Sequence, residues 1–139
     1  MIYTSYFAAM KKMSSYQKTR CVGIALYVPK GIFIPRYPKL APPKDILYRY
    51  KETRDVNKYT IDYNNYLSTL DPKIVERELR NRILVCFESS EKFCHRHLVS
   101  KWLNDNGFKC EELRFKEKEK EVTLPKYEQL TLFGDEIIG

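Results

Sequence analysis

Apolar residues come in short runs along the first part of the chain, separated by polar segments. Residues 1–7, "MIYTSYF", and residues 20–28, "RCVGIALYV", are rich in β-branched and aromatic side chains, which predicts two strands. Residues 8–19 between them have the length of one turn or a short helix. The chain therefore begins with a predicted βαβ unit.

Prolines characterise the next segment, where they stand at positions 29, 35, 38, 42 and 43. Proline is excluded from a helix interior and from a central strand. Residues 28–52 are therefore predicted to form a long loop, basic and aromatic in composition and ordered by its apolar side chains.

Two helix starts follow this loop. Asp55 is placed to cap a helix over residues 56–70, whose apolar and aromatic positions follow a helical stripe. Asp71 is a good N-cap and Pro72 suits the first helical position, so a second short helix is expected directly afterwards.

The last part of the pattern is a strand, a helix and a strand. Residues 82–88, "RILVCFE", are nearly continuously apolar, as expected for a central parallel strand covered on both faces. A helix from about Cys94 to Gly107 and a strand in "FKCEELRF" follow. We predict one α/β domain over residues 1–115, a three-layer Rossmann-like fold with a mainly parallel sheet. Residues 116–139 are predicted to be a charged linker and an extended tail.

Charge narrows the choice of partners. The chain of 139 residues has a formal charge of +7, and such an excess of cations attracts polyanions. No apolar run approaches the roughly 20 residues that cross a bilayer, and the N-terminus lacks the pattern of a secretory signal. We expect a cytoplasmic protein without membrane contact, whose partner is nucleic acid or a nucleotide.

The four cysteines do not form a recognisable framework. No two of them are spaced as CxxC, so neither a zinc site nor a set of disulfides is indicated, and reduced thiols are expected. They stand at Cys21, Cys86, Cys94 and Cys110. No metal and no cofactor is predicted.

The candidate chemistry lies in the loop after the central strand, because ligands of open α/β sheets bind beyond the carboxyl ends of the strands. A helix that begins near Cys94 would lower the pKa of this thiol and attract an anion. Arg96 suits a bidentate grip on phosphate, His95 suits an acid or base, and Glu88 suits the orientation of His95 or the activation of water. A buried thiol beside a surface imidazole and guanidinium is the structural alternative.

The order of these features resembles the bacterial and phage family called domain of unknown function 488. The resemblance rests on "IYTSYF", on "ILVCFE" and on "CHRHLV" leading into a helix with "WL", and it spans residues 2–115. It implies an α/β fold whose active site includes Cys94, His95 and Arg96, with Thr4 and Ser5 facing them. It implies no particular reaction.

A second interpretation of the same loop is a cysteine phosphatase loop that begins at Cys86. Such a loop needs an arginine six residues after the cysteine, and this chain has Lys92 there. Glu88 and Glu91 within the loop would also repel a phosphate, which disfavours this interpretation.

Two further segments suggest partners. Cations alternate with aromatic rings in "RYPKLAPPKDILYRYK", a composition suited to single-stranded or flipped bases; the candidate contacts are Arg36, Tyr37, Lys39, Lys44, Tyr48 and Arg49. In the tail, "QLTLF" resembles the peptide that binds the bacterial sliding clamp, with docking onto the protein's own core as the alternative. Its candidate contacts are Gln129, Leu130, Leu132 and Phe133.

These features predict a DNA-associated enzyme tethered to the replication clamp. It would act as a glycosidase or hydrolase on a base, a nucleotide or a phosphodiester. The alternative is a non-catalytic module that binds nucleotide or nucleic acid, as a phage counter-defence protein could.

Overall fold

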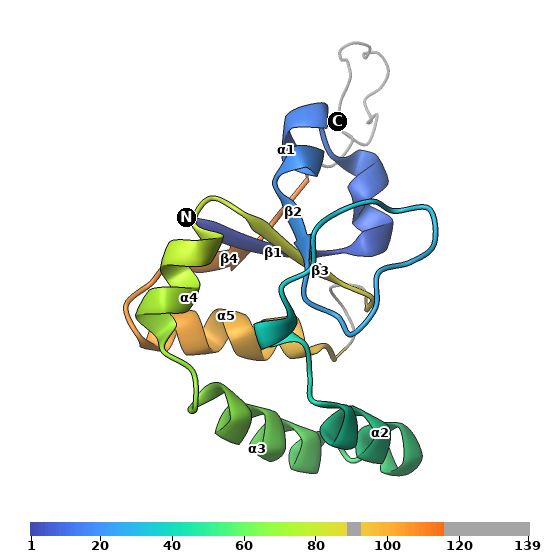
Figure 1. Cartoon of the computed structure of the whole chain (residues 1–139), viewed down its shortest axis with the longest axis vertical. Helices are drawn as coiled ribbons and strands as arrows, with labels where there is room; N and C mark the ends of the chain where they lie inside the picture. The colour runs from blue at the N-terminus through green and yellow to red at the C-terminus, as the bar shows by residue number, and fades with distance from the viewer. Residues whose placement is uncertain (89–92, 116–139) are drawn as a thin grey trace, which may run out of the picture.

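The computed structural model describes residues 1–88 and 93–115, which form an α/β fold (Figure 1). Within these residues the sheet has four strands in the order β2-β3-β1-β4, and all neighbours are parallel. This confirms the predicted fold class, and β3 lies inside the sheet as predicted. The strands are β1 (Ile2–Tyr6), β2 (Cys21–Gly23), β3 (Ile83–Cys86) and β4 (Cys110–Glu112).

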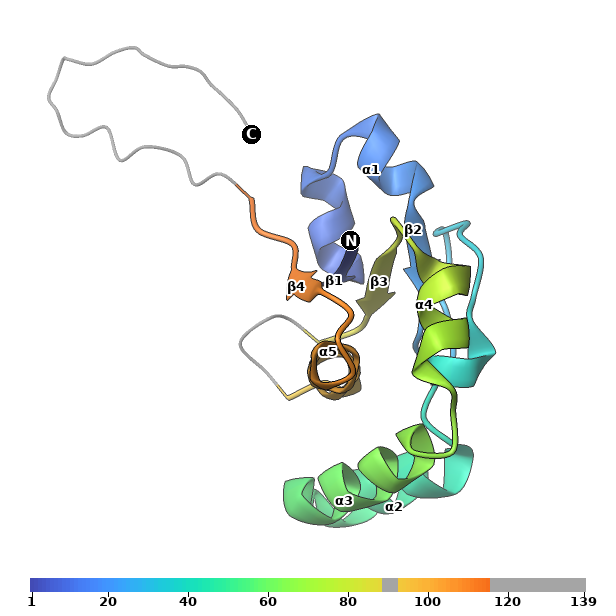
Figure 2. The ribbon, with the colours of Figure 1, turned by 90° about the vertical axis from the view of Figure 1, so that its left-hand side faces the viewer.

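Helices lie on both sides of the sheet (Figure 2). The 3-10 helix η1 (Phe7–Lys12) and the short α1 (Ser15–Thr19) follow β1 on one side, whereas α5 (His95–Asp105) packs against β1, β3 and β4 on the other. Beyond α5 lie α3 (Val56–Leu67), which packs on α5, and α2 (Lys44–Thr53), which packs on α3. The remaining elements are η2 (Pro38–Leu40) and α4 (Pro72–Leu79).

The predicted helix starts are confirmed by their caps. The Asp55 carboxylate accepts a hydrogen bond from the Lys58 backbone N–H, and the Asp71 carboxylate accepts one from that of Lys73. On α3, residues four apart are buried, which is the spacing of one helix face. Val56 and Ile61, which were assigned to the apolar stripe, are exposed instead.

The proline segment is shorter than predicted, because Lys44–Thr53 forms α2. Proline is tolerated at a helix start, so Pro43 ends the loop and precedes the helix rather than excluding it. The loop returns to the sheet at Gly23, whose N–H donates to the Pro35 carbonyl and whose carbonyl accepts from the Tyr37 N–H. The strand β2 ends at Gly23, so the predicted strand over residues 20–28 was too long.

Gly23 also lets the loop come close to the sheet. A Cβ atom at this position would lie 3.0 Å from Val28 Cγ2. Across the described residues, no helix is both long and apolar enough to span a membrane.

Candidate active site at the carboxyl end of the sheet

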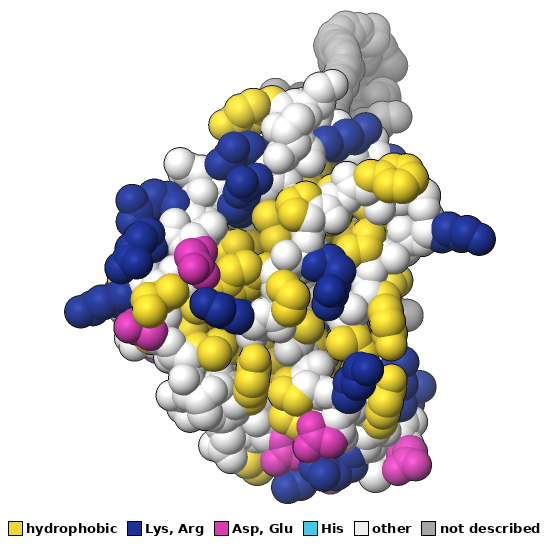
Figure 3. Space-filling model, in the orientation of Figure 1, with side chains coloured by type: hydrophobic (Ala, Val, Ile, Leu, Met, Phe, Trp, Pro, Cys, Tyr) yellow, Lys and Arg dark blue, Asp and Glu magenta, His cyan; other side chains and the backbone are white. Residues whose placement is uncertain are grey.

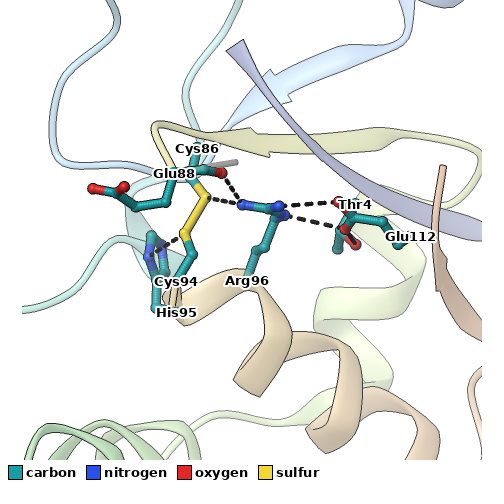
Figure 4. A network of polar contacts seen from close by, with 7 residues as sticks. All are labelled: Thr4, Cys86, Glu88, Cys94, His95, Arg96 and Glu112. Atoms are coloured by element: carbon teal, nitrogen blue, oxygen red, sulfur yellow. Dashed lines mark hydrogen bonds and ion pairs between the residues drawn. A yellow bond between two sulfur atoms is a disulfide. The ribbon is translucent and has the colours of Figure 1, made fainter. Parts of the chain in front are cut away.

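The sequence "CHR" lies where β3 and α5 meet, at the carboxyl end of the parallel sheet (Figure 4). Cys86 is the last residue of β3, and Cys94 is the N-cap of α5, with extended backbone and no hydrogen bond from its own side chain to the helix. Cys94, His95 and Arg96 are all buried. The helix start predicted from the sequence is thus confirmed, and the alternative of a surface imidazole and guanidinium is wrong.

Arg96 is the centre of a polar network. Its side chain has no exposed surface, and its Nε and Nη2 donate to the two carboxylate oxygens of Glu112 at 3.1 and 3.0 Å. Its Nη1 donates to Cys86 Sγ at 3.1 Å and to the Glu88 backbone carbonyl at 2.5 Å. The guanidinium also lies 5.5 Å from the centre of the Tyr6 ring. Because Arg96 is buried and bonded within the protein, it is not placed to grip a substrate phosphate.

Thr4, Ser5 and Glu88 differ in their relation to this network. The Thr4 hydroxyl donates to Glu112 Oε1 at 2.6 Å, so Thr4 belongs to it. Side chains alternate along a strand, so Ser5 faces the other side of the sheet; its hydroxyl is buried and has no partner among the described residues. Glu88 contributes its backbone carbonyl, while its exposed carboxylate points away from the guanidinium (Figure 4).

His95 is held in one ring orientation. Its Nε2 lies 2.7 Å from the Ile24 carbonyl oxygen, which can only accept, so Nε2 carries the hydrogen. Nδ1 faces Cys94 Sγ at 3.8 Å, and the Tyr63 ring packs edge-on against the imidazole at 5.4 Å. Burial lowers the His95 pKa from 6.5 to about 4, with a smaller contribution from the nearby Arg96 charge. The imidazole is therefore neutral at physiological pH, and its Nδ1 lone pair faces the Cys94 sulfur atom.

The expectation of four separate reduced thiols was wrong for one pair. Cys86 and Cys94 are joined through their sulfur atoms as a disulfide, with Cα atoms 7.6 Å apart. Together with His95 they form a cluster of three donor atoms that all lie within 4.8 Å of one another. Cys86 ends β3 and Cys94 immediately precedes α5, so two cysteines eight residues apart in sequence meet where these elements meet.

Sequence reasoning missed Glu112 and the role of Cys86. Glu112 is 16 residues from Arg96 and comes close through the parallel pairing of β4 with β1. The period of two in strands indicated that one of the adjacent Glu111 and Glu112 faces α5, but nothing local indicated its partner. The phosphatase-loop interpretation falls largely on residues 89–92, outside the described residues.

The six candidate nucleic-acid contacts fall into two groups. Three are tied to the protein's own acidic residues: the Tyr37 hydroxyl and Lys39 Nζ contact Glu78, and Arg49 contacts Asp62 at 3.0 Å. Arg36, Lys44 and Tyr48 are exposed, and Arg36 and Lys44 take part in no ion pair within the described part of the chain. In Figure 3, basic side chains are spread among hydrophobic ones over one face of the molecule. The tail contacts, Gln129 to Phe133, lie outside the described residues.

A shallow surface groove of about 650 Å³ lies beside η1 and α1. Its lining includes Phe7, Lys11, Lys18 and Phe33. Phe7 packs edge-on against Phe87, which directly follows Cys86, with ring centres 4.8 Å apart. Cys94, His95 and Arg96 do not line this groove.

The fold and the site define a small α/β protein with a buried Cys-His-Arg centre at the carboxyl end of a parallel sheet. The comparison with protein families agrees with this description. The family DUF488-N3a, described as the active DUF488-N3 subclade, matches residues 5–107, and the chain belongs to it. No curated protein and no solved structure matched the chain.

The Arg96–Glu112 pair predicts a specific pattern of stability. Arg96→Met leaves the Glu112 carboxylate without its cation and should lower the free energy of unfolding by about 3–5 kcal/mol. The double variant Arg96→Met/Glu112→Leu should lose less than the single variant, because no uncompensated charge remains. Urea denaturation followed by circular dichroism measures both.

The matched control is Arg80→Met. Arg80 forms an exposed pair with Glu76 one helical turn away, at 2.8 Å, so its removal should leave the free energy of unfolding nearly unchanged. Equal losses in Arg96→Met and Arg80→Met would contradict a structural role for the buried pair.

Proposed function

We propose that the protein is a hydrolytic enzyme that acts on nucleic acid or a nucleotide, with Cys86, Cys94 and His95 as its reaction centre. The observation that carries the proposal is the convergence of two sulfur atoms and an oriented, neutral imidazole within 4.8 Å at the carboxyl end of the sheet. Such ends are where α/β proteins bind ligands. The description of the family as an active subclade favours catalysis over binding alone.

The proposed chemistry follows from the geometry of the centre. The Ile24 carbonyl fixes the His95 tautomer. Nδ1, which faces Cys94, is therefore the ring nitrogen that is available to take up a proton or to bind an electrophile. The Arg96 guanidinium contacts Cys86 Sγ and so places positive charge beside this sulfur atom. The exposed Glu88 carboxylate is close in sequence and is the candidate for activating water or protonating a leaving group.

The proposed substrate class rests on charge. The formal charge of +7 and the exposed Arg36 and Lys44 suit a phosphate backbone, and Lys11 and Lys18 line the apolar groove next to Phe87. A groove with aromatic and cationic walls suits a base and its phosphate. Cleavage of a base–sugar bond or a phosphodiester would fit such a substrate.

Turnover is the first test. We expect product when the protein, purified under reducing conditions, is incubated with DNA carrying modified or damaged bases and with free nucleotides. Released bases are detected by chromatography and cut strands by gel electrophoresis. Cys94→Ser and Glu88→Gln should each lower the rate by about 100-fold or more, which is typical of the loss of an acid, base or nucleophile.

Cys21→Ala is the matched control, since Cys21 is also a buried strand cysteine but lies outside the centre. It should turn over at the wild-type rate. No product from any substrate, together with thermal protection by one of them, would reject the enzyme and support the binding module instead.

Nucleic-acid binding can be tested separately by its salt dependence. Each phosphate contact contributes about 0.7 to the slope of log affinity against log salt for single strands. Arg36→Gln/Lys44→Gln should therefore reduce the slope by about 1.4, whereas Lys39→Gln/Arg49→Gln should reduce it less, because these cations already contact Glu78 and Asp62. Fluorescence anisotropy with a labelled oligonucleotide measures the slope, and an affinity insensitive to salt would remove nucleic acid from the proposal.

We also propose that the tail tethers the enzyme to the bacterial sliding clamp through residues 129–133. A short peptide that orders on binding should bind weakly, with a Kd in the micromolar range, which corresponds to a binding free energy of about −8 kcal/mol. Calorimetric titration of the clamp should give heat with the wild type and none with Leu132→Ala/Phe133→Ala. Equal heats from both proteins, or none from the wild type, would reject the tether without affecting the proposed chemistry.

A further inference from the structure

The donor atoms of the reaction centre match a transition-metal site. Cys86 Sγ, Cys94 Sγ and one nitrogen of His95 lie within 4.8 Å of one another, and the three side chains are 1%, 5% and 6% exposed. Sulfur and imidazole ligands select zinc and related thiophilic cations, whereas calcium and magnesium need oxygen ligands. Two sulfurs with one imidazole is a ligand set found in catalytic zinc sites.

The orientation of His95 is that of a metal ligand. Metal-bound imidazoles usually donate their other ring N–H to a carbonyl or carboxylate, which fixes the ring and the tautomer. In this protein Nε2 donates to the Ile24 carbonyl at 2.7 Å, so Nδ1 is left to bind a cation. Nδ1 lies 3.8 Å from Cys94 Sγ, close to the separation of about 3.5 Å between nitrogen and sulfur ligands of one tetrahedral zinc ion.

The spacing of the two cysteines also suits an ion between them. Their Cα atoms are 7.6 Å apart, beyond the roughly 4.4–6.8 Å usual for directly bonded cysteines. Tetrahedral zinc separates its two sulfur ligands by about 3.8 Å, and therefore fits a wider Cα spacing. Reduction of the disulfide breaks the bond that holds the two sulfur atoms closer than this separation.

A divalent cation would balance the negative charge of two thiolates at Cys86 and Cys94. Arg96 and Glu112 form a buried pair with no net charge, so two thiolates at Cys86 and Cys94 bring a charge of −2. Buried charge is unfavourable unless it is compensated. A divalent cation cancels it, and the Arg96 N–H that reaches Cys86 Sγ at 3.1 Å supplies the outer hydrogen bond that such thiolates receive.

We propose that Cys86, Cys94 and His95 bind one zinc-class cation through two thiolates and Nδ1, leaving a fourth coordination position open. A thiol reductant first reduces the Cys86–Cys94 disulfide, supplying two electrons and two protons, and metal binding then releases the two resulting thiol protons to solvent. The metal site follows from the donor geometry alone. Its use in hydrolysis rests on the proposed function, since a three-ligand zinc ion lowers the pKa of a bound water to about 7.

Metal content tests the proposal. The full-length protein is purified under reducing conditions without chelator, supplied with zinc, dialysed, and analysed by elemental mass spectrometry and native mass spectrometry. We expect one zinc ion per chain in the wild type and in the control Cys21→Ala. Cys86→Ser and Cys94→Ser should each weaken zinc binding by more than about 100-fold. This loss exceeds the roughly 10–100-fold loss of metal affinity that is typical of substitutions outside the ligand set.

Cobalt provides a spectroscopic readout of the same site. Co²⁺ in place of zinc should give a thiolate charge-transfer band and the intense visible bands of tetrahedral cobalt, both absent in Cys86→Ser. A wild type that stays metal-free after zinc supply overturns the proposal. Zinc retained by both Cys86→Ser and Cys94→Ser overturns it as well.

Thiol labelling of the wild type keeps the test decisive if the serine variants do not fold. Alkylation followed by peptide mapping should show that zinc protects Cys86 and Cys94 and that a chelator exposes them. Labelling that is the same with and without zinc overturns the metal site. One zinc ion per chain without turnover of any substrate would support the metal site and reject the proposed function, so the two failures are distinguishable.

Discussion

The buried guanidinium of Arg96 is the constraint on which the site depends. A cation without solvent contact needs a charged partner and further acceptors, and each acceptor must come from a defined place in the fold. Glu112 comes from β4, the Glu88 carbonyl from the loop after β3, and Cys86 Sγ from the end of β3 itself. Arg96 therefore fixes the start of α5 against three segments of chain. Buried ion pairs contribute little net stability, so the value of this one lies in positioning.

This positioning changes what the rest of the site is able to do. Because Glu112 satisfies the guanidinium, the proposed recognition of an anionic substrate is assigned to exposed cations such as Arg36 and Lys44 rather than to Arg96. The contact between Arg96 and Cys86 Sγ directs positive charge at sulfur rather than at solvent. In the proposed metal site, the neutral Arg96–Glu112 pair would leave the charge of the two thiolates to be balanced by the metal ion.

Local sequence signals predicted the framework of the site, and long-range pairing supplied the remainder. The apolar run of β3, the caps at Asp55 and Asp71, and the helix start at Cys94 depend on neighbours in sequence, and the structure confirms them. Period-two alternation places Thr4 and Ser5 on opposite faces of β1, so only one of the two can face the site.

Other features depend on parallel crossovers between elements distant in sequence, which no local sequence pattern predicts. The pairing of Glu112 with Arg96 requires β4 to lie beside β1, and the contact between Cys86 and Cys94 requires the start of α5 to lie beside the end of β3. The helix α2 was not predicted, because the prolines that exclude a helix interior end at Pro43 and the helix begins at the next residue.

The proline segment has a different role from a lid over the site. Its Leu40 carbonyl accepts the hydroxyl of Tyr63 at 2.5 Å, and the Tyr63 ring in turn packs on His95. At the other end, Ile24 leaves β2 just before this segment and offers its carbonyl to the same imidazole. Ile24 before the segment thus holds His95 through a direct hydrogen bond, and Leu40 within the segment holds it indirectly, through the aromatic contact of Tyr63. Since side chains that are locked by packing and by hydrogen bonds hold reactive geometry best, these contacts give the segment a role in supporting His95.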